Sequence, residues 1–118
     1  MEGRFDAVSV RGPVVVGSIS DVVFVLARDT TVEEVNDVLR QEAATDRYQG
    51  ILAVADEPLV SADIVKDPHA SIVQLDMTRV VGGTLVKVMS WYDNEWGFTS
   101  QMIQVTVQQL GLDARASV

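Results

Sequence analysis

The segment from Ser90 to Gly97, SWYDNEWG, gathers the side chains best suited to binding a ligand. Two Trp and one Tyr fall within it, in a chain that has two Trp, two Tyr and three Phe in all. It lies where a predicted strand gives way to a predicted helix, and such a junction can present polar side chains and free helix N-terminal amides to a ligand. The alternative is structural, with Asp93 or Asn94 as the helix N-cap and the Trp rings as core anchors.

Arg11 is a second candidate for ligand binding. It follows an apolar stretch and precedes Gly12-Pro13. Its planar guanidinium could bind a phosphate or a carboxylate group. The alternative interpretation is a solvated charge at the end of a strand.

Asp67, His69 and Ser71 place an acid, a base and a hydroxyl close together along the chain. A Ser-His-Asp triad is assembled by the fold and not by sequence spacing, so the pattern alone does not define one. We expect His69 to be a loop residue that makes ordinary hydrogen bonds.

Several chemistries are excluded by composition. The chain has no Cys and a single His, which rules out a thiolate nucleophile, a disulfide framework and a cysteine or multi-histidine metal site. The glycines never take the Gly-x-Gly-x-x-Gly spacing of a dinucleotide-binding turn, and no Walker-type Gly-Lys-Ser/Thr occurs. We therefore assign no catalytic residue and no metal ligand.

Charge and hydropathy limit the partners. The 17 acidic side chains outnumber the 9 basic ones, for a net charge of −8, whereas binding to nucleic acid relies on clustered Lys and Arg. The N-terminus has no apolar segment of the kind a secretory signal requires, and no run approaches the roughly 18 apolar residues of a membrane span. We expect a cytoplasmic protein that binds neither nucleic acid nor membrane.

The elements that must position these residues follow from hydrophobic period and from Gly and Pro punctuation. A capping box at Thr31 to Glu34 starts a helix, in which the Thr31 hydroxyl accepts the Glu34 amide and the Glu34 side chain returns to the cap. Gly111 stops the last helix. The predicted order is ββαββββα: strands at 5–10, 18–27, 51–55, 59–65, 70–77 and 84–92, and helices at 31–44 and 95–110. This pattern predicts an α+β fold with a mixed, largely antiparallel sheet and helices packed on one face.

Two predicted strands are apolar at nearly every position, Asp21 to Ala27 and Leu85 to Met89. A strand with one solvated face alternates apolar and polar residues, so both faces of this sheet are expected to be covered. Two helices can cover one face of about six strands. The other face is then expected to contact a neighbouring subunit or domain, unless the many Val residues reflect β-propensity alone.

Four stretches together resemble glyceraldehyde-3-phosphate dehydrogenase. They are Arg28–Asn36 (RDTTVEEVN), Gly50–Leu52 (GIL), the run from Leu59 through Asp67 to Ile72, and Ser90–Gly97, which is the most specific. The resemblance covers about Gly3 to Gly111 and concerns only the C-terminal, catalytic part of that enzyme. It implies that residues 1–118 form a single domain of that kind.

The resemblance implies a role for three side chains. Arg11 matches an arginine that contacts substrate or inorganic phosphate, Asn94 an asparagine that holds the nicotinamide carboxamide, and Tyr92 a tyrosine beside the catalytic centre. It also implies NAD or NADP as the cofactor of the full-length family, and a mixed sheet with helices on one side whose other side meets neighbouring subunits of a tetramer.

The departures from the family are equally specific. The nucleophilic cysteine, its paired histidine base and the dinucleotide-binding domain precede the region that the resemblance covers. Around Arg11 the family reads RVPTPTGS, whereas this chain reads RGPVVVGS, with one proline and two hydroxyls fewer.

The leading hypothesis is therefore a catalytic-domain fragment, inactive and without bound cofactor when alone. Such a fragment would act as an oligomerisation or interaction module that self-associates, or binds a full-length or complementary dehydrogenase subunit, through its exposed sheet face. The alternatives are a stand-alone enzyme acting on a phosphorylated ligand and a regulatory decoy of the full-length dehydrogenase.

Overall fold

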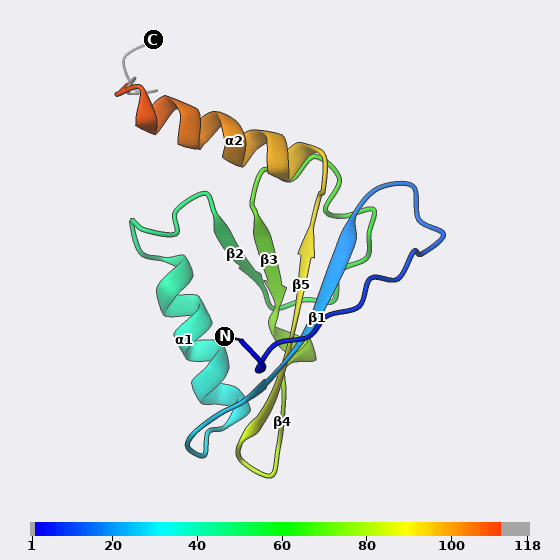
Figure 1. The fold of residues 1–118 in the computed structure, drawn as a ribbon, viewed down its shortest axis with the longest axis vertical. Coiled ribbons are helices and arrows are strands. Elements are labelled where there is room, and N and C mark those ends of the chain that lie inside the picture. The colour runs from blue at the N-terminus through cyan, green and yellow to red at the C-terminus, as the bar shows by residue number, and fades with distance from the viewer. Residues whose placement is uncertain (1, 112–118) are drawn as a thin grey trace.

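A computed structural model describes residues 2–111 and contains a mixed five-stranded sheet (Figure 1). The strands run in the order β1, β5, β3, β2, and β4 also pairs with β5. Their bounds are β1 Ser18–Val25, β2 Leu52–Ala55, β3 Ser71–Gln74, β4 Arg79–Val81 and β5 Leu85–Tyr92. The β2–β3 pair is parallel and the other pairs are antiparallel. The predicted α+β class, with a mixed and largely antiparallel sheet, is confirmed.

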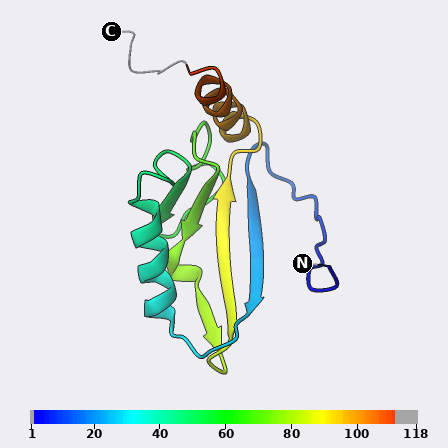
Figure 2. The same ribbon diagram turned by 60° about the vertical axis from the view of Figure 1, so that its left-hand side comes forward.

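The first helix, α1 (Val32–Ala43), starts where the sequence predicts. The Thr31 hydroxyl accepts the backbone N–H of Glu34 at 3.2 Å, as a capping box requires. The Glu34 carboxylate does not return to the cap, because it binds the Arg28 guanidinium at 2.6 Å and the Thr30 hydroxyl at 2.7 Å. The helix packs beside β2 (Figure 2).

The second helix, α2 (Trp96–Gln109), extends beyond the ends of the strands, whereas α1 runs alongside them (Figures 1 and 2). It ends at Gln109, one residue before the predicted end, with Leu110 as its C-cap and Gly111 following at a φ of 63°. Its apolar stripe is largely exposed, including Met102 and Ile103. The helix therefore leaves most of its apolar surface uncovered.

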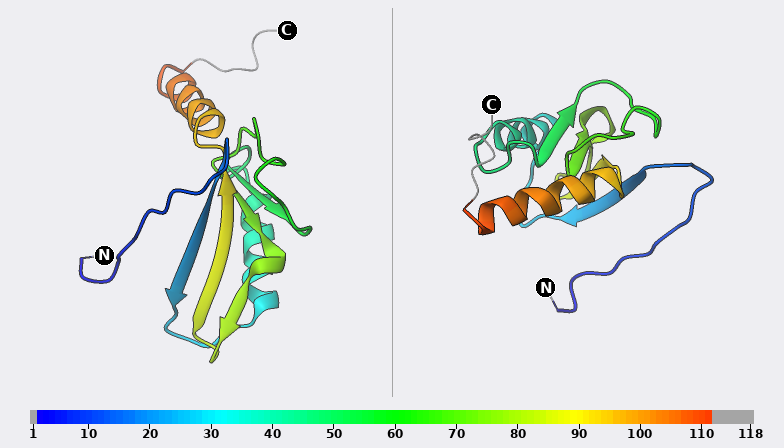
Figure 3. Two further views of the ribbon diagram at one scale, coloured as in Figure 1. Left: turned by 90° about the vertical axis from the view of Figure 1, so that its right-hand side faces the viewer. Right: turned by 90° about the horizontal axis from the view of Figure 1, so that it is seen from above.

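Two predicted strands are wrong. Residues 5–10 form no strand and lead away from the sheet (Figure 3), and their apolar side chains, such as Phe5 and Val8, are exposed. Alternation of residue types makes a strand only where another strand is available for pairing. Residues 59–65 form turns, because the Asp63 carboxylate accepts the Val60 N–H at 2.8 Å and the Asp63 N–H donates to the Val60 carbonyl.

Two further boundaries differ from the prediction. The predicted strand at 70–77 ends at Gln74, and a 3₁₀ turn, η1 (Leu75–Met77), follows it. The short strand β4 was not predicted. It forms a hairpin with β5 through Gly82 and Gly83, whose φ angles of 59° and 75° suit a tight turn.

The core is small. Among the described residues the buried hydrophobic side chains are Ile64, Ile72, Val73, Leu75 and Val86, and the buried polar ones are Gln74, Thr78 and Asp93. Trp91 is partly buried and donates its indole N–H to the buried Gln74 side chain at 2.7 Å, so this Trp ring is attached to the core. Of residues 2–111, no helix is long and apolar enough to cross a membrane.

Candidate functional site

The junction between β5 and α2 is built around the Asp93 carboxylate, which is 3% exposed. It accepts the backbone N–H groups of Lys66 at 2.8 Å, Glu95 at 3.0 Å and Trp96 at 2.7 Å. Burial alone would raise the pKa of Asp93, but these three donors together lower it below its ordinary value. Of the two candidate caps, Asp93 is therefore the residue that holds the start of α2.

The loop before β3 is fixed against the same junction. Lys66 has a φ of 64°, in the left-handed region that disfavours residues with a Cβ, and it is the only non-glycine residue with a positive φ in the described part of the chain. A Cβ at Gly97 would lie 2.7 Å from the His69 carbonyl oxygen. Only glycine lets α2 approach this loop so closely.

Gln101 adds a further tie between α2 and the sheet. Its Nε2 donates to the carbonyl oxygens of Gly50 and Pro68, at 2.9 Å each. The first turns of α2 are thus attached to two loops that flank β2 and β3. This attachment gives the side chains of the junction a defined position.

Tyr92 and Asn94 line one cavity of about 240 Å³ at this junction, so the structure brings two of the three predicted site residues together. The other lining residues are Ala70, Asp93, Phe98 and Gln101. The Asn94 side chain is exposed: its Oδ1 accepts the Ser18 hydroxyl at a long 3.4 Å, and its Nδ2 donates to Glu95 at 3.1 Å. These solvent-accessible hydrogen bonds can be exchanged for bonds to a ligand.

Arg11 lies apart from this cavity. It is exposed and belongs to the segment before β1, which leads away from the sheet (Figure 3). It is not among the residues that line either cavity. The described residues thus join Tyr92 and Asn94 but not Arg11.

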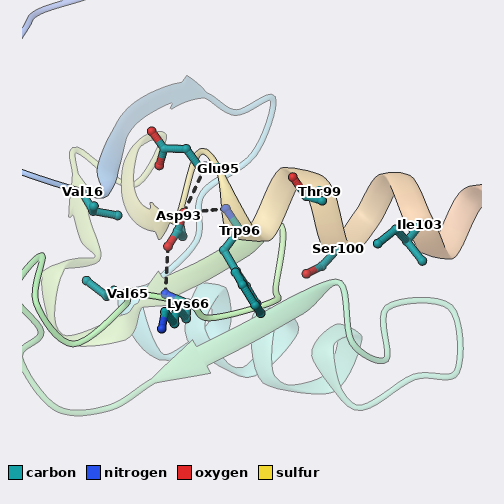
Figure 4. A pocket seen from close by; sticks show the side chains of 9 residues that line it. All are labelled: Val16, Val65, Lys66, Asp93, Glu95, Trp96, Thr99, Ser100 and Ile103. Atoms are coloured by element: carbon teal, nitrogen blue, oxygen red, sulfur yellow. Dashed lines mark hydrogen bonds between the residues drawn. The ribbon is translucent and has the colours of Figure 1, made fainter.

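A second cavity of about 430 Å³ shares Asp93 as a lining residue with the first (Figure 4). It is lined by Val16, Val65, Lys66, Asp93, Glu95, Trp96, Thr99, Ser100 and Ile103. Sequence reasoning did not find it, because its walls come from three separate segments. The one sequence signal for this cavity was Trp96, an aromatic residue in the motif. Trp96 is half exposed in the structure, so it is not a core anchor.

His69 belongs to an ordinary loop network, as the sequence predicts. Its Nδ1 lies 2.7 Å from Asp67 Oδ1, and its backbone N–H donates to the same oxygen at 2.9 Å. The Ser71 hydroxyl bonds to Ser90 and not to His69, so the three residues do not form a triad. Within residues 2–111 no group of three or more acidic, His or Cys side chains could hold a metal ion.

The fold and the junction define an α+β domain that presents a tyrosine and an asparagine at one end of a mixed sheet. A family model described as glyceraldehyde 3-phosphate dehydrogenase, C-terminal domain, matches residues 1–94. The chain belongs to this family, which confirms the resemblance seen in its sequence motifs.

Curated relatives agree with this assignment. The chain is 47% identical over 107 residues to a glyceraldehyde-3-phosphate dehydrogenase of Cereibacter sphaeroides, covering 91% of this chain and 32% of the relative. It is 45% identical over 108 residues to that of Zymomonas mobilis, covering 92% and 32%. The chain therefore spans about a third of the length of these relatives.

Proposed function

We propose that this chain provides the nicotinamide-orienting junction and a subunit-contact surface of a glyceraldehyde-3-phosphate dehydrogenase. The parent reaction is the NAD(P)-dependent, phosphorylating oxidation of glyceraldehyde 3-phosphate in the glycolytic pathway of the cytoplasm. The observation that carries the proposal is that Tyr92 and Asn94 share one cavity whose backbone is fixed by Asp93.

The cavity suits a single planar ring better than a whole dinucleotide. Pockets for drug-sized ligands measure about 300–1,000 Å³, whereas this one measures about 240 Å³. The aromatic side chains of Tyr92 and Phe98 provide apolar walls, and the Asn94 amide supplies one donor and one acceptor to a carboxamide. Asn94 would hold the carboxamide of a nicotinamide cofactor and so orient its ring, and the cofactor would supply a hydride acceptor.

The same chemistry explains why we expect no turnover from this chain alone. The parent reaction begins with nucleophilic attack by a thiolate on the aldehyde carbon, and the 118 residues contain no Cys. Its side chains can orient a ring and contact a phosphate, but they offer no thiol to form the covalent intermediate. In this proposal Arg11 contacts the substrate phosphate. That contact requires the segment before β1, which carries Arg11, to lie near the substrate.

The proposed partner is a second copy, or a full-length or complementary dehydrogenase subunit, on the exposed sheet face. Val25, Leu85 and Val81 are directly opposite one another on β1, β5 and β4, so their side chains share a face. They are 81%, 41% and 62% exposed. An apolar row across three strands is typical of a surface that another protein covers.

The test is ring binding together with an activity assay. Nicotinamide mononucleotide should perturb the Asn94 side-chain amide and Phe98 ring signals in NMR spectra of the chain, and Asn94→Ala should weaken that binding about tenfold. Asn36→Ala is the matched control, because Asn36 lies away from the cavity and donates to the Leu75 carbonyl. Equal binding by the Asn94 variant, or turnover by the pure chain with NAD, phosphate and aldehyde, would refute the proposal.

A further inference from the structure

Glu95 holds the side-chain amide of Asn94 from one side. Asn94 Nδ2 donates to Glu95 Oε1 at 3.1 Å. The Glu95 backbone is itself fixed, because its N–H donates to the buried Asp93 carboxylate at 3.0 Å and its carbonyl accepts the Thr99 N–H at 3.1 Å. The Glu95 carboxylate therefore extends from an anchored position at the start of α2.

Ser18 contacts the other end of the same amide. Its hydroxyl donates to Asn94 Oδ1 at 3.4 Å, and it is the first residue of β1, where it pairs with Tyr92 of β5. An Asn amide nitrogen carries two hydrogens and its oxygen two lone pairs, so each atom keeps one position for a further hydrogen bond. Because Asn94 lines the cavity that it shares with Tyr92, those two positions can meet a ligand there.

The Glu95 carboxylate decides which way this amide lies. A hydroxyl can donate or accept, so Ser18 would fit either end of the Asn94 amide, whereas an ionised carboxylate only accepts. Turning the amide through half a turn would place Oδ1 against the carboxylate oxygen and would lose a charge-assisted hydrogen bond. Glu95 thus selects one orientation of Asn94 and fixes where its donor and its acceptor stand.

We infer that Glu95 is a positioning residue, which acts through Asn94 so that the cavity accepts a ring carboxamide and rejects the corresponding ring carboxylate; this inference rests on the proposed function. Glu95 lines the larger cavity and not the one that Tyr92 and Asn94 share. A carboxamide has a donor and an acceptor, so it can use both free positions of Asn94. A carboxylate only accepts, and it brings a second negative charge to the nitrogen that the Glu95 carboxylate already shares.

Paired binding measurements with two mononucleotides test this specificity. Nicotinamide mononucleotide and nicotinic acid mononucleotide differ only in the carboxamide or carboxylate group on the ring. NMR titration of the unmodified chain should give a dissociation constant about tenfold lower for the amide, and Glu95→Gln should reduce that ratio about fivefold. If Glu95 only supported the fold, its replacement would weaken both ligands alike and leave the ratio unchanged, and that result would overturn the inference.

Two control variants separate the effect of Glu95 from net charge and from Ser18. Glu33→Gln removes the same charge from the first turn of α1, away from the β5–α2 junction (Figure 1), and should change the ratio less than about twofold. Ser18→Ala removes the hydroxyl that fits either orientation of the amide, and it should also change the ratio less than about twofold. A ratio that falls as far in either control as in Glu95→Gln would overturn the inference.

Spectra of the ligand-free chain give a second readout. The Asn94 side-chain amide protons should show nuclear Overhauser effects to the Glu95 γ-methylene protons and not to the Ser18 β-methylene protons, and the reverse pattern would overturn the inference. If neither nucleotide binds, the proposed function is refuted and the inference falls with it. If nicotinamide mononucleotide binds and Asn94→Ala weakens it, but Glu95→Gln leaves the ratio unchanged, the inference alone is refuted.

Discussion

Lys66 and Asp93 are joined by a hydrogen bond of 2.8 Å from the backbone N–H of Lys66 to Oδ2 of Asp93, although 27 residues separate them in the chain. The same carboxylate accepts the N–H groups that open α2. One side chain thus couples the loop before β3 to the junction that carries Tyr92 and Asn94. Both cavities share Asp93 as a lining residue.

Replacing Asp93 with Ala should therefore destabilise the domain strongly. Three backbone donors lose their acceptor, and an unsatisfied buried group costs about 1–3 kcal/mol, so we expect a loss of about 2–4 kcal/mol in the free energy of unfolding. Urea denaturation measures this loss as a lower midpoint at an unchanged slope. Asp93→Asn, which keeps one carbonyl oxygen, should lose less, and exposed Asp46→Ala should lose under about 0.5 kcal/mol. Equal stability of the two Asp93 variants would contradict this account.

The domain should also lose stability in acid through two carboxylates. The Arg28 guanidinium and the Thr30 hydroxyl lower the pKa of Glu34 from 4.5 to about 2, and the pKa of Asp93 is lowered as well. A folded-state pKa below the unfolded value means that the stabilisation is complete above the unfolded pKa and is lost as pH falls through the folded one. For Glu34 the window runs from about 4.5 down to about 2.

The variant that isolates the Glu34 contribution is Glu34→Gln. It should be less stable than the unmodified chain at pH 7, and its stability should fall less steeply between pH 5 and pH 2. Glu33→Gln makes the same change of charge one residue earlier in the same turn of α1. If both variants gave the same pH profile by thermal denaturation, the pairing with Arg28 would not be the cause.

Local signals in the sequence predicted much of the fold. The cap at Thr31, the long apolar strands β1 and β5 and the glycine stop at Gly111 each depend on neighbours close in the chain. The failures depend on distant ones. Residues 5–10 have strand-like alternation but no strand beside them, and residues 59–65 are rich in apolar side chains but are held in turns by Asp63.

The candidate site divides in the same way. Its aromatic and polar residues lie within one short motif, and the resemblance of that motif to the family is what singles out Tyr92 and Asn94. The left-handed backbone of Lys66 could not, because lysine carries no signal for a positive φ, and it becomes apparent only from the bond to Asp93. The close approach of Gly97 to His69 is likewise a tertiary contact that a single sequence does not reveal.

Gly97→Ala should test how tightly α2 is held against the loop before β3. The added methyl would lie 2.7 Å from the His69 carbonyl oxygen, and because this is a backbone atom the loop must move. Overpacking of this kind costs about 1–3 kcal/mol, and the shift should also alter the NMR signals of the Asn94 side chain. Gly12→Ala, where no atom lies within 4 Å of the new Cβ, should leave stability and the Asn94 signals unchanged. An unfolding midpoint for Gly97→Ala equal to that of the unmodified chain would show that the helix is free to move away.

Lys66→Gly should stabilise the domain, in contrast to most substitutions. At a φ of 64° a residue with a Cβ is strained by roughly 1 kcal/mol, and glycine is not. Part of that gain is offset because glycine makes the unfolded chain more flexible, so we expect an increase of up to about 1 kcal/mol in the free energy of unfolding. Lys66→Ala separates backbone strain from the loss of the ammonium group, because it keeps the Cβ and should give no increase. A rise in stability for Ala equal to that for Gly would show that relief of the left-handed backbone is not the cause.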